Sequence, residues 1–514
     1  MESTLHIPNV SVSTFILEKC KTFGNKTALV DSETDRKLSF NECISLVRRI
    51  ANGLLKEGFQ KGDTLFMFTK TCLEYPCCIL ATAAIGGTLQ AASPNYTSYE
   101  MKHAFATCRP SYVMTSPDLV EMVREVNSED VKKIITFGEV EGCLSFDDLI
   151  LSCPDNQPIP DCDLDPARAT AAQLFSSGTT GLPKSVQISH RNIVANIVQS
   201  LPLLTIKEGD IFLCFLPFFH IYAIVVLLSS LFAGSTVVVM KRFHPTEFLE
   251  NIPKYQVTHL SLVPPVMLWL TKHPSLSYDK LKSVKGITCG AAPLSKEVED
   301  QVREIFHLDY ICQGYGMTEC LITHIASAEY HKYGSVGKTV PMTECKIIKP
   351  ESDEILKNND KGEVCVRGPQ VMLGYLSNPV ATSSTIDADG WLHTGDIGYI
   401  DDEGFLFIVD RIKELIKYKA FQVAPAELEE VLLQHPGVAD VGVIGIYNNE
   451  AGELPKAFVV KVRDAEVTEN ELKSFVIDRL SNYKQLRGGV EFVTEIPKSP
   501  SGKILRRLLR EREK

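Results

Sequence analysis

Apolar, β-rich runs alternate with helical patterns along most of this chain, and this alternation limits the folds open to it. Asp63–Thr69 (DTLFMFT) is typical of a buried strand, and Leu73–Ala92 predicts a helix followed by a turn. Further strands are predicted at Ser111–Thr115 and Val131–Thr136, with a polar helix around Asp118–Val126 between them. Repeated strand–helix units of this kind favour parallel sheets covered by helices.

The pattern changes along the 514 residues, which are too many for a single hydrophobic core. Beyond about Gly334, the short runs CKIIKP, GEVCVRG and FLFIVD are separated by turns and predict a smaller, more antiparallel section. From Pro425, a predicted helix precedes two strand-like runs and a second helical pattern, ENELKSFVIDRL. The charged stretch Asp410–Lys419 lies between these sections and is the predicted domain boundary.

Charge and cysteine usage exclude some classes of protein. The net charge of −11 argues against a nucleic-acid-binding protein, because a phosphate backbone requires a basic surface. The 15 cysteines lie scattered without a paired framework, which favours a reducing compartment. The first residues lack a signal-peptide pattern and the last lack the SKL tripeptide of peroxisomal proteins. We therefore expect a cytoplasmic protein.

One uncharged stretch, Ile211–Met240, allows two interpretations. Its length and apolarity are those of a membrane span. However, Pro217 and His220 interrupt its first half, and the VVV run after Gly234 is typical of a separate buried strand. A buried helix followed by a strand has the same hydropathy in a large α/β protein, so we favour that interpretation and expect no integral membrane span.

The most specific motif is FSSGTTGLPK at Phe175–Lys184. Small hydroxylated residues that alternate with glycines allow successive backbone N–H groups to face one oxyanion, and hydroxyls with a lysine complete a phosphate cradle. From Gly178 the chain differs from the P-loop pattern GxxxxGK[ST] at one position, where Pro183 replaces the second glycine. Proline has no N–H to offer a phosphate, and the following SVQISH is more strand-like than helical, so we reject the P-loop interpretation.

This decapeptide and six further blocks resemble the signatures of the adenylate-forming superfamily, which includes acyl-CoA synthetases, beetle luciferases and nonribosomal-peptide adenylation domains. The blocks are PFFHIYA at 217–223, GAAPL at 290–294, QGYGMTE at 313–319, WLHTGD at 391–396, DRIKELIKYKAFQVAPAELE at 410–429 and PKSPSGKI at 497–504. The resemblance covers nearly the whole chain and is greatest to the 4-coumarate–CoA ligase and luciferase-like branch.

The resemblance implies an α/β fold whose large N-terminal domain, residues 1–411, has two α/β subdomains with parallel sheets plus a small β-barrel-like section. A smaller mobile α+β domain, residues 412–514, would follow, with a hinge near Lys413. It also implies an ATP-dependent, AMP-forming acyl-CoA ligase that uses Mg²⁺ and CoA. Such an enzyme converts a small carboxylic acid to acyl-AMP and pyrophosphate, then transfers the acyl group to CoA. We expect a monomer or a homodimer.

The same blocks imply roles for single residues in ATP binding. Thr318 resembles the residue near the α-phosphate, and Glu319 resembles the magnesium ligand, a hard carboxylate suited to Mg²⁺. Tyr315 would stack on adenine, and Asp396 and Arg411 would bind the ribose hydroxyls. The expected phosphate-binding residues are Ser176, Ser177, Gly178, Thr179, Thr180, Gly181 and Lys184. The other residues expected to line the nucleotide site are Gly290, Ala291, Ala292, Gln313, Gly314, Gly316 and Met317.

A second group would act on the carboxylate and on CoA. A histidine in an apolar run is ordinarily a satisfied core residue, but within PFFHIYA His220 resembles the residue that closes the carboxylate pocket and admits the thiol. Lys503 resembles a lysine that contacts the carboxylate and the α-phosphate during adenylation. The expected catalytic residues are therefore His220, Thr318, Glu319, Lys413 and Lys503. The acyl-pocket candidates are His220, Tyr222, Cys289, Leu321 and Ile322. The remaining cofactor-binding candidates are Arg242, Lys417, Lys419, Ala420 and Gln422, of which Lys417 and Gln422 resemble residues around AMP after the small domain rotates.

Several positions depart from the family pattern. Ser185 stands where a glycine usually follows the lysine, and Ala420 replaces a glycine that leaves room for the pantetheine arm. Cys289, Leu321 and Ile322 change the expected acyl site. A mostly apolar pocket with one polar edge predicts an aryl-propenoic or medium-chain aliphatic acid rather than acetate.

Two alternatives remain open from the sequence. A luciferase-like enzyme that oxidises an acyl-adenylate would carry the same motifs. A non-catalytic relative could retain the fold, but Lys184, Glu319 and Lys503 are all present and favour an active ligase.

Overall fold

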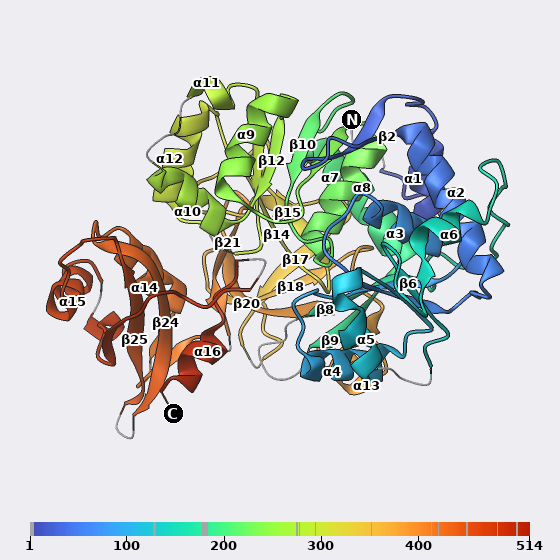
Figure 1. Ribbon diagram of the computed structural model, residues 1–514. Coiled ribbons are helices and arrows are strands. Elements are labelled where there is room, and N and C mark those ends of the chain that lie inside the picture. Colours follow the sequence, from blue (N-terminus) through green and yellow to red (C-terminus); the bar gives the residue numbers. More distant parts are fainter. Residues whose placement is uncertain are drawn as a thin grey trace.

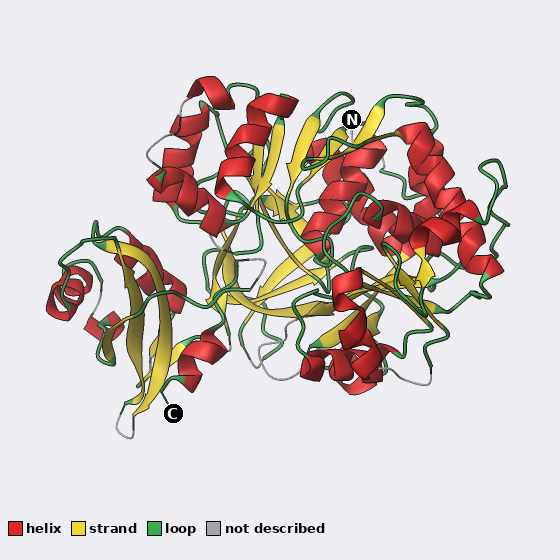
Figure 2. Cartoon of the chain, in the orientation of Figure 1, coloured by secondary structure: helices red, strands yellow, loops and turns green. Residues whose placement is uncertain are grey.

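The computed structural model shows two large sheets surrounded by helices and a separate C-terminal unit to one side (Figures 1 and 2). It describes residues 5–126, 130–176, 183–273, 276, 278–292, 294–350, 352–412, 414–419, 421–448, 451–480, 482–499 and 502–513, with only the backbone of residues 421 and 422.

The first sheet has nine strands in the order β16-β15-β14-β13-β12-β10-β11-β1-β2. The pairs from β14 to β1 are parallel, whereas β2, β15 and β16 pair antiparallel at the two edges. Its strands are β1 (Thr27–Asp31), β2 (Lys37–Ser39), β10 (Ile211–Cys214), β11 (Thr236–Val239), β12 (His259–Leu262), β13 (Gly286–Cys289), β14 (Cys312–Met317), β15 (Leu321–Ile325) and β16 (Lys338–Thr339). The helices of this half are α1 (Val12–Cys20), α7 (His190–Leu204), α8 (Ile221–Ala233), α9 (Pro245–Tyr255), α10 (Pro264–Lys272), α11 (Tyr278–Leu281) and α12 (Lys296–Phe306).

The second sheet has eight strands in the order β19-β9-β8-β4-β3-β5-β6-β7. The β8–β9 and β9–β19 pairs are antiparallel and the other described pairs are parallel, so the prediction of two mainly parallel sheets is confirmed. Its strands are β3 (Thr64–Phe68), β4 (Thr88–Ala91), β5 (Tyr112–Thr115), β6 (Lys133–Thr136), β7 (Leu144–Ser145), β8 (Thr170–Ser176), β9 (Lys184–Ser189) and β19 (Gly374–Tyr375). The helices of this half are α2 (Phe40–Lys56), α3 (Tyr75–Ala84), α4 (Ser98–Cys108), α5 (Val120–Val126), α6 (Phe146–Leu151) and α13 (Pro379–Ser383).

The predicted helix and turn at Leu73–Ala92 required one correction, because the segment also contains strand β4. The helix α3 ends at Ala84, and the chain turns at Gly86, whose φ is 72°, before β4 enters the sheet between β3 and β8. At Gly87 an added Cβ would lie 2.4 Å from the Phe59 ring, so the turn packs too tightly for a side chain.

The uncharged stretch Ile211–Met240 forms two strands of the first sheet and the mostly buried helix between them. It comprises β10, the helix α8 and strand β11, and α8 ends at Gly234 with φ 81°. The prediction of a buried helix followed by a strand is confirmed. No helix among the described residues has both the length and the apolarity that crossing a membrane requires.

The section after Gly334 contains the predicted antiparallel strands. They pair in the order β17-β18-β20-β21, with every pair antiparallel. Their bounds are β17 (Glu344–Ile348), β18 (Gly362–Arg367), β20 (Leu392–Ile400) and β21 (Leu406–Arg411). In Figure 1 this sheet lies between the two large sheets and the C-terminal unit.

The C-terminal unit is an α+β fold with its own core. Its sheet runs β23-β22-β25-β24, with β26 parallel to β25, and Leu428, Leu472 and Val459 are among its fully buried side chains. Its elements are β22 (Ile416–Tyr418), β23 (Phe421–Val423), α14 (Pro425–Leu433), β24 (Val438–Asn448), β25 (Gly452–Lys461), α15 (Glu469–Ile477), β26 (Gly489–Phe492) and α16 (Arg506–Glu511). The boundary at residue 411 and the hinge near Lys413 remain predictions, since Lys413 lies outside the described residues.

Candidate active site

Three predicted ribose- and adenine-binding residues meet at one buried carboxylate. Asp396 on β20 and Arg411 on β21 are direct partners in the strand register, and the Arg411 Nε lies 3.1 Å from Asp396 Oδ1. The Tyr315 hydroxyl, on β14, donates to Asp396 Oδ2 at 2.7 Å. Burial and this neighbouring carboxylate raise the pKa of Tyr315 well above its usual value. The Asp396 carboxylate is therefore held on both oxygens by groups of the large domain.

Close backbone packing explains two glycines of the motifs. A Cβ at Gly316 would lie 1.8 Å from the Leu321 carbonyl oxygen, and a Cβ at Gly290 would lie 3.3 Å from the Gly314 carbonyl oxygen. Leu321, at the start of β15, has φ 52°, a left-handed conformation that is rare for a residue with a side chain. The turn between β14 and β15 is thus tightly constrained, and it carries Thr318 and Glu319.

Glu319 and Lys184 lie on either side of a tyrosine that sequence reasoning missed. Tyr375, on the two-residue strand β19, donates its hydroxyl proton to Glu319 Oε1 at 2.9 Å. The Lys184 Nζ, at the start of β9, lies 4.8 Å from the centre of the Tyr375 ring, a cation–π distance. Because β19 pairs with β9, Tyr375 connects the expected magnesium ligand to the lysine of the phosphate motif. The sequence signal was only a Gly-Tyr dipeptide.

The side chain of one expected pocket residue, Tyr222, contacts the strand that carries another, Cys289, and a third, His220, has a ring nitrogen unpartnered within the described part of the chain. Tyr222, in the first turn of α8, has its hydroxyl 3.0 Å from Thr288 Oγ1, and its ring lies 3.9 Å from a Cβ placed at Gly290. Cys289 is buried at the end of β13. His220 occupies the N-cap position of α8, and its Nε2 is buried without a hydrogen-bond partner among the described residues. A buried polar atom of this kind is available to a ligand.

Three residues that depart from the family pattern, Ser185, Leu321 and Ile322, lie in different surroundings. Ser185 on β9 donates to Gln90 Oε1 at 2.8 Å and is almost fully buried in the second sheet. Ile322 exchanges two backbone contacts with the Asn196 side chain of α7, at 2.7 and 3.3 Å. Leu321 is only 1% exposed and belongs to the main core. The Ser185 hydroxyl therefore forms a hydrogen bond inside the second sheet, between β9 and β4.

Lys503 reaches the site from the C-terminal unit. Burial, followed by the positive charge of Arg411, lowers the pKa of Lys503 to about 8, although the carboxylates of Asp396 and Glu319 oppose this shift. Burial, followed by the positive charge of Lys503, lowers the pKa of His220 to about 4. None of the ion pairs among the described residues includes the Lys503 ammonium group. Lys503 thus places an unpaired cation among residues from four other motifs.

Contacts between the large domain and the C-terminal unit hold Lys503 in this position. At the end of α10, the Lys272 Nζ donates to the carbonyl oxygens of Val438 and Ala439, at 3.2 and 3.0 Å. Gly502 has φ 82°, and an added Cβ would lie 2.8 Å from the Pro265 ring. The residue before Lys503 must therefore be glycine for the loop to pack against α10. Sequence reasoning missed Lys272, because the carbonyls that it binds leave no side-chain signal.

A second missed group is a buried carboxylate beneath the QGYGMTE strand. Glu299 on α12 accepts a hydrogen bond from Gln313 Nε2 at 2.7 Å, and burial raises the pKa of Glu299 to about 7. It shares the inward face of α12 with Val302 and Phe306. The sequence contained a signal for this buried acid, because Glu299, Val302 and Phe306 follow the i, i+3, i+7 spacing of one helix face.

Some predicted residues are not gathered at this site. Arg242 follows β11 and is exposed. Lys417 and Lys419 are exposed on the C-terminal unit, where the Lys417 amide donates to Glu453 at 2.7 Å and the Lys419 ammonium lies 5.6 Å from the Tyr418 ring. Ser176 is buried at the end of β8. The structure does not describe the predicted residues Ser177, Gly178, Thr179, Thr180, Gly181, Lys413 and Ala420, nor the side chain of Gln422. Ala291 and Ala292 follow β13, and Gln313, Gly314 and Met317 lie on β14; their contact with the nucleotide stays a prediction.

Comparisons with known proteins agree with the motifs. Residues 16–376 match the family "AMP-binding enzyme", and residues 427–503 match the "AMP-binding enzyme C-terminal domain". The chain is 41% identical to a 4-coumarate–CoA ligase of Pinus taeda, over 100% of this chain and 96% of the relative. It is 40% identical to 4-coumarate–CoA ligase 1 of Solanum tuberosum, over 99% and 95%.

Solved structures share the whole fold. ATP-bound MatB from Rhodopseudomonas palustris has a TM-score of 0.91 at 26% identity, over 98% of this chain and 99% of that one. The o-succinylbenzoate CoA synthetase of Bacillus subtilis, in complex with its acyl-adenylate intermediate, has a TM-score of 0.82 at 27% identity, over 98% of both chains. The resemblance stated from the motifs is confirmed, and the chain belongs to the AMP-binding enzyme family.

Proposed function

We propose that this protein is an AMP-forming acid–thiol ligase, which activates a carboxylic acid with MgATP and transfers the acyl group to CoA. One observation carries the proposal. The unpaired cation of Lys503 lies within electrostatic reach of His220, Glu319, Asp396 and Arg411, which come from four other sequence motifs. The relatives named 4-coumarate–CoA ligase, similar over the whole chain, support this assignment.

The large domain would bind the nucleotide. Asp396, fixed by Tyr315 and Arg411, presents a carboxylate that can accept hydrogen bonds from ribose hydroxyls. Lys184, with the hydroxyls and amides of residues 176–181, would hold the β- and γ-phosphates. The carboxylate of Glu319 and the neighbouring Thr318 hydroxyl are hard oxygen donors that suit Mg²⁺, which would offset charge on the phosphates when it binds with ATP.

Lys503 and His220 would act on the reacting carboxylate. In adenylation, a carboxylate oxygen attacks the α-phosphorus, the bond to the bridging oxygen breaks, and pyrophosphate leaves. Two anions must approach each other, so a nearby cation lowers the barrier. Burial without an ion pair explains why the pKa of Lys503 is lowered to about 8, and a carboxylate with an α-phosphate would supply the missing partners. The orphaned Nε2 of neutral His220 can bond to the same carboxylate.

In the second step, the CoA thiol would attack the acyl carbon of the mixed anhydride and release AMP. We propose that the small domain rotates about Lys413 between the steps, which withdraws Lys503 and brings other residues of this domain to the site. Lys417 and Gln422 would then contact AMP, Lys419 and Ala420 would border the pantetheine passage, and Arg242 would meet the phosphates of CoA. The exposure of Lys417 and Lys419 in the described arrangement is compatible with this proposal.

The acid is proposed to be aryl-propenoic or medium-chain aliphatic. Tyr222 and buried Cys289 would make a mostly apolar wall with a hydroxyl at one edge, and Ile322 lies on β15, separated from the Cys289 strand by β14. The names of the relatives, 4-coumarate–CoA ligases, favour the aryl-propenoic class.

The function is tested by following both products. Purified protein with MgATP and a panel of carboxylic acids should release pyrophosphate, and adding CoA should yield AMP and a thioester in equal amounts. Pyrophosphate release without a thioester, or with oxygen-dependent light, would identify a different adenylating enzyme. No pyrophosphate with any acid, from folded protein, would contradict the proposal.

The same panel tests the acid class. Each buried CH₂ contributes about 0.8 kcal/mol, so the four additional CH₂ groups of hexanoate over acetate correspond to roughly 3 kcal/mol of binding. We expect kcat/KM for hexanoate or cinnamate to exceed that for acetate by at least about 100-fold. Comparable values for acetate and these acids would contradict the predicted pocket.

A further inference from the structure

A second cluster of ligand-type side chains lies on the small antiparallel sheet. Glu363 and Cys365 are two positions apart on β18 and therefore lie on the same face of the strand. Cys365 is the direct register partner of His393 on β20. Their ligand-type atoms all lie within 4.8 Å of one another. Cys365 is fully buried, whereas Glu363 and His393 are partly exposed, so the cluster is open to small solutes on one side.

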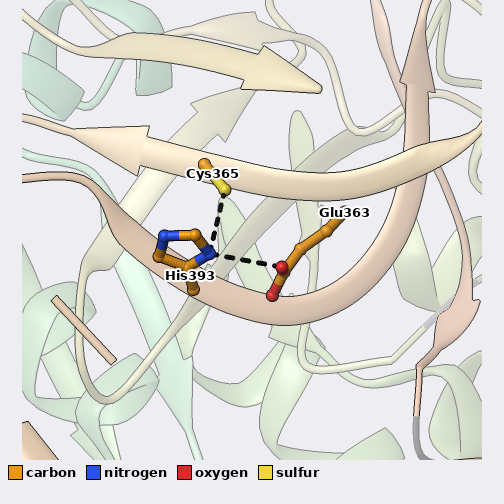
Figure 3. Close-up of side chains that lie close together, drawn as sticks. All are labelled: Glu363, Cys365 and His393. Carbon is orange, nitrogen blue, oxygen red and sulfur yellow. Dashed lines mark hydrogen bonds and ion pairs between the residues drawn. The ribbon is translucent and has the colours of Figure 1, made fainter. Parts of the chain in front are cut away.

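Both neighbours of His393 point at the same ring nitrogen. Cys365 Sγ lies 3.6 Å and Glu363 Oε2 lies 3.2 Å from His393 Nδ1 (Figure 3). One nitrogen carries one proton or one lone pair, so it cannot bond well to both groups at once. A thiol, a carboxylate and an imidazole nitrogen that converge on one point are instead arranged as metal ligands.

The two separations from His393 Nδ1 fit a tetrahedral zinc site. With Zn–S at about 2.3 Å and Zn–N or Zn–O at about 2.0–2.1 Å, tetrahedral angles place sulfur about 3.6 Å and oxygen about 3.3 Å from the nitrogen. The observed distances are 3.6 Å and 3.2 Å. A thiolate with an imidazole selects zinc-like ions over Mg²⁺, which prefers oxygen ligands. The expected magnesium ligand, Glu319, is therefore a chemically different site.

Outer groups orient two of the three ligands. Asp387 Oδ2 lies 3.6 Å from His393 Nε2, on the opposite side of the ring, where a carboxylate typically supports a metal-bound histidine. The second oxygen of Glu363 accepts a hydrogen bond from the Gly395 amide at 3.0 Å. Gly395 directly precedes Asp396, so the cluster also fixes the backbone beside the predicted ribose carboxylate.

We propose that Glu363, Cys365 and His393 bind one Zn²⁺ ion, with water as the fourth ligand. On binding, the Cys365 thiol loses its proton to solvent, and any proton on His393 Nδ1 is also released. The ion crosslinks β18 to β20 immediately before Asp396. It therefore stabilises the folded large domain in proportion to its concentration over its dissociation constant.

The experiment uses the full chain, stripped with a chelator and titrated with Co²⁺ as a spectroscopic probe. We expect one Co²⁺ per chain, a thiolate-to-cobalt absorption band, and displacement of the band by Zn²⁺ but not by excess Mg²⁺. Zn²⁺ should also raise the Tm. No binding, or Co²⁺ binding without a thiolate band, would overturn the proposal.

Matched variants locate the site. Cys365→Ser should abolish the band and the Zn²⁺-dependent rise in Tm, whereas Cys345→Ser should retain both, because Cys345 is a half-buried thiol on neighbouring β17 outside the cluster. A band that survives in Cys365→Ser, or disappears in Cys345→Ser, would place the metal elsewhere and overturn the proposal.

A variant that keeps all three ligands tests the site even if Cys365→Ser does not fold. Asp387→Asn leaves all three ligands in place and should weaken Zn²⁺ binding about 10–100-fold while keeping the thiolate band. The affinity is measured by competition with a chromophoric chelator. An unchanged affinity in this variant would overturn the arrangement in which Asp387 supports the ligand His393.

Discussion

Two cations serve the candidate nucleotide site, and the chain positions them in different ways. Arg411 is fixed by strand register beside Asp396, within one sheet of the large domain. Lys503 depends on how the C-terminal unit docks, through Lys272 and the close packing of Gly502 on Pro265. Burial, followed by the negative charge of Glu297 on the large domain, raises the pKa of Glu430, so like charges also oppose this docking. A register contact should persist throughout the reaction, whereas a docking contact can be made and broken.

The largest effect is expected at Lys503. Lys503→Ala should slow acyl-AMP formation by about 10²–10³-fold, the usual loss for one preorganised electrostatic contact. Thioester formation from supplied acyl-AMP and CoA should remain near normal, since the proposed rotation withdraws this lysine. Single-turnover assays of the two half-reactions measure both rates.

A nearby arginine provides the control for Lys503→Ala. Arg507 carries the same charge four residues later but is exposed and pairs with Glu511 at 2.8 Å. Arg507→Ala should change either rate by no more than about twofold, because exposed charges interact weakly through water. Equal losses in both half-reactions of Lys503→Ala would mean that the site is static.

Asp396, which strand register fixes beside Arg411, should affect both half-reactions and not only adenylation. Asp396→Asn weakens charged hydrogen bonds to the ribose, which contribute about 1.5–3 kcal/mol, so both half-reactions should slow by roughly 10–100-fold. The KM for ATP and the Kd for AMP are the measurements. A loss confined to adenylation would show that Asp396 also acts in only one step, and the comparison with Lys503 would fail.

The pH dependence should separate the two steps as well. The pKa of Lys503 is lowered to about 8, so the lysine is charged below this pH and loses its proton as the pH rises through it. The kcat/KM for acyl-AMP formation should therefore fall about tenfold per pH unit above this value. The thioester step should lack this alkaline limb.

Lys503→Arg is the control for the pH effect. A guanidinium keeps its charge throughout this range, so any remaining adenylation activity should no longer decline near pH 8. A decline that persists unchanged in Lys503→Arg would assign the titration to another group.

A smaller effect is expected from the docking contact itself. Lys272→Met removes hydrogen bonds to two carbonyls, a net loss of about 1 kcal/mol, which corresponds to roughly a fivefold smaller equilibrium constant for docking. Adenylation should slow by up to that factor, while the thioester step stays equal or becomes faster. Lys254→Met is the matched control, since Lys254 pairs with Asp35 within the large domain. Equal slowing of both steps in Lys272→Met would remove this lysine from the docking account.

The sequence predicted the parts of the site that are carried by local patterns. Consecutive apolar runs indicated the parallel strands. The resemblance of the QGYGMTE and WLHTGD blocks to family signatures pointed to Tyr315 and Asp396, whose roles in nucleotide binding stay predictions. Tyr375 was missed because its contact with Glu319 spans 56 positions and its strand has only two residues. The zinc-type cluster was missed for the same reason, because only the pairing of β18 with β20 brings His393 to Cys365. Local sequence does not encode which distant strand will be the neighbour.

The smallest effect on activity is expected at Ser185, which contacts neither the Asp396–Arg411 pair nor the docking contacts of the C-terminal unit. Its hydroxyl binds Gln90 in the second sheet, so Ser185→Gly leaves a buried amide oxygen unpaired at a cost of about 1–3 kcal/mol. The free energy of unfolding in urea should fall by that amount. Both half-reaction rates per folded molecule should stay within about twofold, because the lost contact lies in the sheet and makes no preorganised contact with a reacting group. A selective change in ATP binding would show instead that Ser185 assists the adjacent phosphate motif, and that the large domain contains a further nucleotide contact outside the Asp396 cluster.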